Sequence, residues 1–132
     1  MEYHRSARFF EAGLPFSESV RLGDILYLSG QLGNVPGQKV LTAGGIAAEA
    51  HQTMRNIAHI LGKHGLGFDH VFRVQVMLAD MAEWEAFNQA YVGYFKPERL
   101  PARSAWGCNG LALGARCEVE AWAFCGEVFA PS

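Results

Sequence analysis

The sequence lacks the long apolar runs and basic stretches that are typical of membrane proteins and of most nucleic-acid binders. No apolar segment approaches the ~20 residues that span a bilayer, and residues 1–5 are not followed by the apolar region of a secretory signal. Eight arginines and three lysines are scattered along a chain of net charge −2, whereas nucleic-acid binders usually present a basic surface. We therefore expect a cytoplasmic protein without a membrane or nucleic-acid partner.

The residue patterns of metal sites, disulfide frameworks and common catalytic motifs are also missing. Cys108, Cys117 and Cys125 have no CxxC spacing, and the five histidines form no HExxH motif. Gly44 and Gly45 are not followed by a P-loop lysine, and no GxGxxG or GxSxG sequence occurs. These absences predict reduced cysteines and no metal site, and they leave nucleotide binding and serine hydrolysis unsupported.

The chain contains enough apolar material for one core. Half of its 132 residues are apolar and 12% are aromatic, which argues against disorder. The length is typical of one domain, and no linker, repeat or low-complexity stretch divides it. We expect a single domain over residues 1–132.

Apolar spacing and turn residues predict two helices. The first, over residues 46–64, has an apolar stripe at spacings of three and four and ends before Gly65. The second begins at a capping box formed by Asp80 and Glu83 and ends near residue 95, before a proline. Its stripe is interpreted as core and consists of Trp84, Phe87, Tyr91 and Phe95.

Five strands are predicted, at residues 17–21, 25–29, 71–79, 103–108 and 116–124. A glycine-rich loop over residues 30–45 follows the second of them. In strand 71–79, alternation assigns Phe72, Val74, Val76 and Leu78 to one face and Val71, Arg73, Gln75 and Met77 to the other.

The order of the elements predicts an α+β fold, with one mixed sheet and both helices on one face. The other face mixes apolar residues such as Val71, Met77 and Ala105 with Arg73 and Gln75. It is too apolar to be fully hydrated and too polar for a simple core. A homo-oligomer that buries this face against copies of itself resolves the conflict, and ligand sites would then lie at subunit edges.

Two groups of charged residues are candidates for chemistry. Arg103 lies near a strand start, where its planar guanidinium could bind a carboxylate through two bonds, although an arginine there is usually solvated. Glu118 and Glu120 share one face of the last strand. One of them could orient or deprotonate a water, or both could form an exposed rim or an ion pair with Arg116 or Arg73.

Six short segments, each weak alone, occur in a specific order and spacing. They are Leu14-Pro15-Phe16-Ser17, Ser29-Gly30-Gln31, Gln52-Thr53 with Asn56, Phe87-Asn88 with Tyr91, Pro101-Ala102-Arg103-Ser104 and Glu118-Val119-Glu120-Ala121. Over about residues 13–123 the chain thereby resembles the RidA family (YjgF/YER057c/UK114) of reactive-intermediate deaminases. The resemblance implies a chorismate-mutase-like fold and a homotrimer whose sheets form a central barrel, with clefts between the subunits.

The same resemblance implies the activity of a 2-iminobutanoate/2-iminopropanoate deaminase, a hydrolase that needs no cofactor. Enamines and imines such as 2-aminoacrylate and 2-iminobutyrate would be converted to 2-keto acids and ammonia. Arg103 would hold the substrate carboxylate, and Glu118 would orient the attacking water. The cleft would be completed by Phe16 in its wall, Ser29 and Gly30 in its lining, the backbone around Ala105, and Asn88 at its edge.

Two departures from the family pattern concern the pocket wall. Phe16 replaces the usual tyrosine, and Ala105 replaces a frequent cysteine, so the substrate is less defined than the reaction class. Two alternatives stay open. One is a trimer that binds small carboxylates without turnover, and the other is an endoribonuclease, against which the acidic balance argues.

Overall fold

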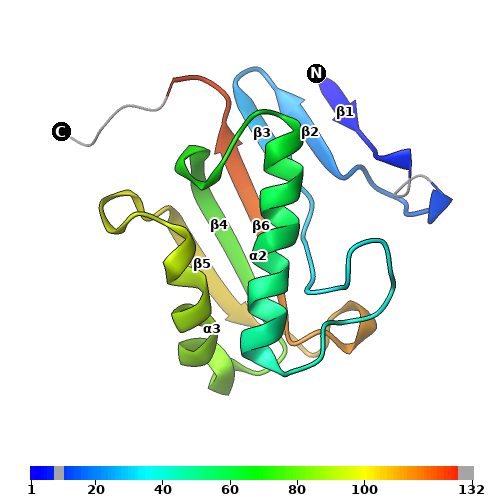
Figure 1. The fold of residues 1–132 in the computed structure, drawn as a ribbon, viewed down its shortest axis with the longest axis vertical. Helices are drawn as coiled ribbons and strands as arrows, with labels where there is room; N and C mark the ends of the chain where they lie inside the picture. Colours follow the sequence, from blue (N-terminus) through cyan, green and yellow to red (C-terminus); the bar gives the residue numbers. More distant parts are fainter. Residues whose placement is uncertain (8–10, 128–132) are drawn as a thin grey trace.

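The computed structural model describes residues 1–7 and 11–127, which form one mixed sheet with two α-helices on the same face (Figure 1). The helices are α2 (Ile46–Lys63) and α3 (Trp84–Tyr91). The strands are β1 (Glu2–His4), β2 (Ser19–Leu22), β3 (Ile25–Leu28), β4 (Val71–Leu78), β5 (Ala102–Gly107) and β6 (Cys117–Phe124). Their order in the sheet is β1-β2-β3-β6-β4-β5, with β4 and β5 parallel and the other neighbours antiparallel. The predicted α+β fold is confirmed.

Helix α2 covers the centre of the sheet with the apolar stripe that the sequence predicts. Ala50, Met54, Ile57 and Leu61 are each at most 1% exposed, so the stripe is fully removed from water. The helix ends one residue before the predicted His64, and Gly65 follows with φ +70°. Glycine adopts this left-handed conformation without strain, which explains the stop. Within the described residues, no helix has the length and apolar character needed to cross a membrane.

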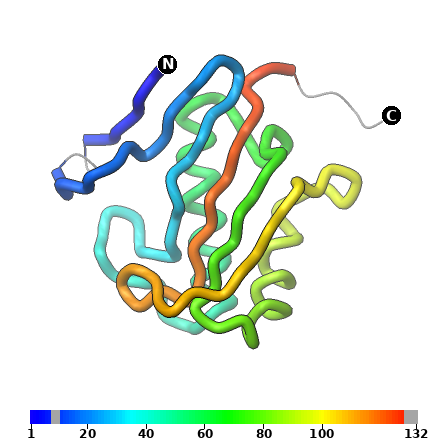
Figure 2. The backbone as a smooth tube through the Cα atoms, turned by 180° about the vertical axis from the view of Figure 1, so that it is seen from behind, coloured from blue at the N-terminus to red at the C-terminus, as the bar shows by residue number. Residues whose placement is uncertain are grey.

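Strand β6 divides its residues strictly between the two faces of the sheet. Its odd-numbered residues lie under the helices and are at most 2% exposed, namely Cys117, Val119, Ala121 and Ala123. Its even-numbered residues, Glu118, Glu120, Trp122 and Phe124, are half-buried on the other face. That face carries no helix, as the view from behind shows (Figure 2). We call it the open face.

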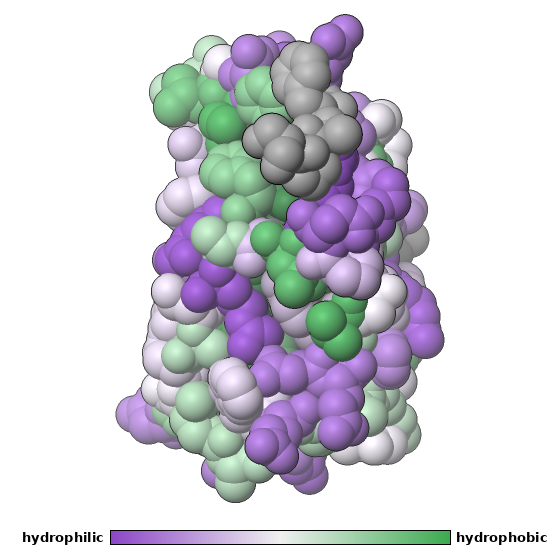
Figure 3. Space-filling model, turned by 90° about the vertical axis from the view of Figure 1, so that its left-hand side faces the viewer, coloured by the Kyte–Doolittle hydropathy of each residue, from purple (hydrophilic) through white to green (hydrophobic). Residues whose placement is uncertain are grey.

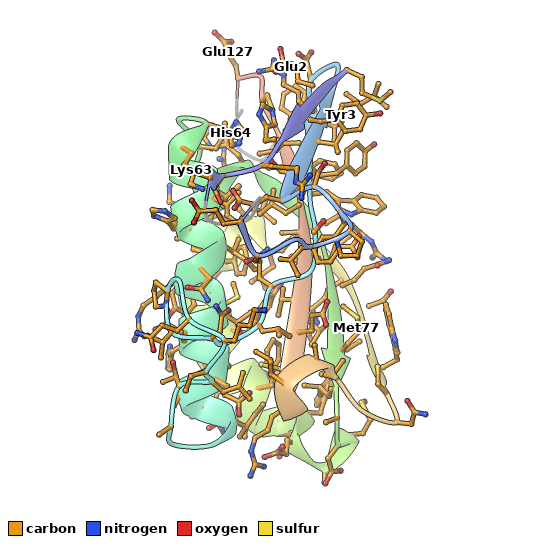
Figure 4. All side chains as sticks on the ribbon, turned by 90° about the vertical axis from the view of Figure 1, so that its right-hand side faces the viewer. Glu2, Tyr3, Lys63, His64, Met77 and Glu127 are labelled. Atoms are coloured by element: carbon orange, nitrogen blue, oxygen red, sulfur yellow. The ribbon has the colours of Figure 1, made fainter. Side chains whose placement is uncertain are left out.

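Strand β4 departs from the predicted alternation at its start. A register shift between Val71 and Arg73 interrupts the pairing with β6. Such a bulge adds a residue without a partner and reverses the alternation before it. Val71 is therefore buried, at 5% exposure, and Phe72 lies on the open face, where its ring packs 6.4 Å from that of Trp122. The prediction was wrong for these two residues and right for the rest, including Met77, which lies away from α2 (Figure 4).

The second helix is shorter than predicted because 3-10 turns flank it. Residues 81–83 and 92–94 form these turns around α3. Asp80 accepts the Ala82 N–H at 2.9 Å, as a cap should, but the Glu83 carboxylate pairs with Arg116 at 2.9 Å instead of closing a capping box. Trp84 is 41% exposed, so its assignment to the core was wrong.

The short strand β1 was not predicted from the sequence. It pairs antiparallel with β2, with Tyr3 opposite Val20. Figure 4 shows it near the C-terminal end of α2, where the ring of His4 packs edge-on against that of His64 at 4.6 Å. Three residues with one apolar side chain give too little pattern to identify a strand.

The thiol of Cys117 should be unreactive in the native protein. The residue is 0% exposed, and burial raises its pKa to about 11. Since the thiolate is the reactive form, we expect DTNB to titrate the half-buried Cys108 and Cys125, and the third free cysteine only after denaturation.

Cys117→Ala should leave the native titre unchanged and remove one thiol from the denatured titre. A lower native titre in this variant would contradict the assignment.

Candidate functional site

A pocket of about 380 Å³ opens where β2, β3 and β6 meet. It contains four of the residues that the sequence assigned to the site: Phe16, Ser29, Gly30 and Glu118. Its other lining residues are Val20, Tyr27, Leu28 and Glu120. The first three of these were missed, although alternation along 25–29 places Tyr27 on the same face as Ser29 and could have indicated it.

Hydrogen bonds on two sides fix the segment that follows β3. The Ser29 N–H donates to the Glu18 carbonyl at 3.0 Å, and its hydroxyl donates to the Ser17 carbonyl at 2.6 Å. On the other side, Gln31 and Val119 exchange backbone bonds of 2.8 and 3.0 Å. The chain is thus held between β2 and β6, and the backbone of Gly30 faces the start of β6.

Gly30 allows the Glu118 carboxylate to lie against the main chain. A Cβ at this position would overlap the carboxylate oxygen Oε2 of Glu118 and lie 2.9 Å from its Cδ. A side chain here would therefore displace the carboxylate from this position. Glycine keeps the space free, whereas its backbone conformation is one that other residues adopt.

The carboxyl group of Glu118 is partly withdrawn from water and has no partner of its own. Burial, and secondly the charge of Glu120, raise its pKa above the usual range. The predicted alternative of an ion pair does not form, because Arg116 pairs with Glu83 and Glu49 and Arg73 donates to Ser104 Oγ at 3.0 Å. Among the described residues nothing donates a hydrogen bond to Glu118. Its oxygens are therefore available to a water or a ligand.

Arg103 lies on the other face of the sheet, at the edge formed by β5. It pairs in register with the buried Val74, so its side chain extends beneath α3. The guanidinium Cζ lies 4.9 Å from the ring centroid of Tyr91, and 5.9 Å from those of Phe87 and Trp84. The interpretation of Arg103 as a solvated strand end is therefore wrong. Figure 3 shows this edge, where small apolar patches alternate with polar surface.

The charge of Arg103 is not neutralised inside the chain. No ion pair or hydrogen bond joins it to an aspartate or glutamate within the described residues. Burial raises the pKa of Tyr91 to about 12, and the nearby guanidinium offsets part of that rise. Tyr91 is therefore a neutral phenol, and the described residues supply no counter-ion to the Arg103 guanidinium.

The remaining two predicted residues belong to β5 and α3, the elements that hold Arg103 and the rings around it. Ala105 is two residues further along β5, on the same face as Arg103, and packs against the core, so the prediction that it lies on the face without helices is wrong. Asn88 belongs to α3, and its buried Oδ1 has no hydrogen-bond partner among the described residues. The predicted site thus forms two groups on opposite faces, with β4 between β5 and β6. One chain does not bring Arg103 to Glu118.

A family model described as Endoribonuclease L-PSP matches residues 7–125. The chain belongs to this family, the RidA/YjgF family.

Named relatives and solved structures agree with this membership. The human protein named 2-iminobutanoate/2-iminopropanoate deaminase is 38% identical over 114 residues, which are 86% of this chain and 82% of the human one. Protein HMF1 of Saccharomyces cerevisiae is 35% identical over 83% of this chain and 84% of its own. The crystal structure of RidA from an Antarctic Psychrobacter superposes with a TM-score of 0.79 at 28% identity, covering 94% of this chain and 95% of the other. Family membership supports deamination of reactive intermediates as the broad reaction class.

The described residues 1–7 and 11–127 contain no group of three or more His, Cys, Asp or Glu that could hold a metal ion. The roles assigned to individual site residues remain predictions.

Ionisation of Glu118 should cost stability at neutral pH. Its folded pKa is raised, so the native state holds this proton more tightly than the unfolded chain, and stability falls as pH rises through the raised pKa. Glu118→Gln removes the cost. We expect its Tm at pH 7.5 to exceed that of the wild type by about 2 °C, with a difference that shrinks towards pH 4.

Thermal melts followed by circular dichroism between pH 4 and pH 8 measure this difference. Glu98→Gln, at an exposed position, is the control and should show no such trend. A Glu118→Gln variant less stable than the wild type at pH 7.5 would refute the assignment.

Proposed function

We propose that this protein hydrolyses small 2-imino acids and their enamine tautomers, of the 2-iminobutyrate and 2-aminoacrylate type, to 2-keto acids and ammonia. The observation that carries the proposal is the guanidinium of Arg103, which lies at the sheet edge and is paired with no carboxylate of the described residues 1–7 and 11–127. A planar guanidinium binds a carboxylate through two parallel hydrogen bonds, and this fixes the orientation of the substrate.

Hydrolysis requires a positioned water as well as an oriented substrate, and Glu118 holds this water. The imine carbon is already electrophilic, so catalysis needs orientation and a proton acceptor more than it needs a strong nucleophile. An enamine first takes a proton on its terminal carbon to become the imine. Water then adds to the imine carbon while Glu118 accepts one of its protons, and Glu118 returns this proton to the nitrogen to give a carbinolamine. The hydroxyl proton moves to the nitrogen as the C–N bond breaks, so ammonia leaves and the carbonyl of the 2-keto acid forms. No electron is exchanged with an external group.

The two groups of site residues meet only between subunits. In the proposed homotrimer, Arg103, Asn88 and Ala105 of one subunit face the pocket of the next, which contains Glu118, Ser29, Gly30 and Phe16. The open face supports this assembly, because it exposes apolar side chains that include Phe16 at 48%, Phe72 at 41% and Trp106 at 41%. Burial of this face between copies would form the central barrel.

Loss of the Arg103 guanidinium should abolish most of the activity. We expect Arg103→Ala to lower kcat/KM at least ~30-fold, which corresponds to ~2 kcal/mol of transition-state binding. The measurement is release of 2-keto acid from imines generated in situ by a pyridoxal-phosphate dehydratase, corrected for spontaneous hydrolysis. Arg55→Ala, at an exposed arginine of α2, is the control and should stay within about twofold of the wild type.

An unchanged kcat/KM in Arg103→Ala would refute the role. A folded wild-type protein that binds 2-keto acids but does not accelerate hydrolysis would favour the binding-only alternative. RNA cleavage by purified protein that disappears in Glu118→Gln would favour the endoribonuclease alternative.

A site shared between subunits should be restored by mixing two inactive variants. Arg103→Ala carries an intact Glu118, and Glu118→Gln carries an intact Arg103. Random assembly after joint unfolding and refolding makes about a quarter of the sites native at both positions, so we expect about a quarter of the wild-type activity.

Each variant refolded alone, and a mixture of folded variants without exchange of subunits, are the controls. A jointly refolded mixture that is no more active than its components would show that both residues must come from one chain.

A further inference from the structure

Three aromatic rings of one helix surround the guanidinium of Arg103. Trp84, Phe87 and Tyr91 follow one another at spacings of three and four along α3, so their side chains share one face of the helix. All three centroids lie within 6 Å of the Arg103 Cζ. This is the range in which a cation is attracted by the negative face of an aromatic ring.

Trp84 differs from the other two rings in its surroundings. Phe87 is 0% and Tyr91 5% exposed, and these two rings stack on each other at 5.6 Å. Trp84 is 41% exposed and makes no ring-to-ring contact within the described residues. Its aromatic contact is with Arg103, which gives a reason for an indole at the exposed start of α3.

Aromatic rings and a carboxylate restrain a guanidinium through different interactions. A carboxylate would occupy the N–H groups of Arg103 and neutralise its charge. Ring faces attract the cation without accepting its N–H groups in the guanidinium plane, so the donors that do not face the Tyr91 hydroxyl stay available. No acid is paired with Arg103 in the described part of the chain, so the rings are what restrain it.

We propose that Trp84 is a positioning residue that holds the Arg103 guanidinium in the orientation in which it receives the substrate carboxylate. This role rests on the proposed function of Arg103. An arginine side chain that is free to rotate loses much conformational freedom when it binds a ligand, and prior restraint by the indole removes part of that loss. Trp84 therefore acts on the binding of the substrate carboxylate and not on the attack of water, which is the proposed role of Glu118.

The test compares one variant that lacks an aromatic ring at residue 84 with another that has a smaller ring there. Trp84→Leu keeps an apolar side chain but removes the π face, and we expect KM to rise about fivefold while kcat stays within about twofold. Trp84→Phe restores a ring and should return KM to within about twofold of the wild type. The dissociation constant of 2-oxobutanoate, measured by calorimetry, should rise about fivefold in Trp84→Leu and recover in Trp84→Phe.

Val92→Ala is the matched control, because Val92 is a similarly exposed apolar residue, at 49%, just beyond the C-terminal end of α3. It should change neither KM nor the dissociation constant. Circular dichroism melts of all variants exclude unfolding as the cause. An unchanged KM in Trp84→Leu, a fall in kcat with KM unchanged, or a Trp84→Phe variant no better than Trp84→Leu would each overturn the proposal.

The two measurements separate this proposal from the proposed function. Wild-type protein that binds 2-oxobutanoate but hydrolyses no imine, with weaker binding in Trp84→Leu, would refute the activity and support the positioning role. Wild-type protein that hydrolyses imines with kinetics that Trp84→Leu leaves unchanged would support the activity and refute the positioning role. Wild-type protein that neither binds nor hydrolyses would overturn both.

Discussion

The strict alternation of β6 determines where the chemistry of this fold can lie. The strand is central, with β3 on one side and β4 on the other, and the helices cover one of its faces. Its small apolar residues must lie under the helices, so Glu118 and Glu120 are confined to the open face. A shift of one residue would place both carboxylates in the core, at a cost far above that of any single contact in the structure. The core therefore fixes the position of the acid.

Strand β6 is also bonded to α2 at its start and to the pocket segment further along. At its start, the buried Glu49 of α2 accepts the Arg116 N–H at 2.9 Å, and the Arg116 side chain continues to Glu83 at 2.9 Å, just before α3. At its next residues, the backbone of Val119 pairs with Gln31, which brings Gly30 against Glu118. The backbone of the pocket is thus set by main-chain bonds, and the missing Cβ of Gly30 leaves the space in which the Glu118 carboxylate lies.

The spacing of apolar residues predicted the features that depend only on neighbouring residues in the chain. The stripe of α2 and the alternation of β6 follow from spacing, and both agree with the structure. The bulge at Val71 does not follow from spacing, because it depends on pairing with another strand. The exposed position of Trp84 beside Arg103 does not follow from spacing either, because β5 brings this cation to the helix. For the site, motif order supplied the candidate residues, whose roles stay predictions. That Arg103 and Glu118 occupy opposite faces depends on strand order and on register across β4, which are long-range properties.

Placement of the two charges on opposite faces has a chemical consequence. A guanidinium and a carboxylate that met inside one subunit would form an ion pair, which would occupy the N–H groups that the proposed function assigns to the substrate and the oxygens that it assigns to the water. In the described chain neither group has such a partner, since aromatic rings flank Arg103 and the Gly30 backbone flanks Glu118. Under the proposed trimer the two would face a shared cleft without contact, and a substrate between them would supply the carboxylate for one and the reacting carbon for the other. Within the described residues, the fold therefore leaves both groups without an ion-pair partner.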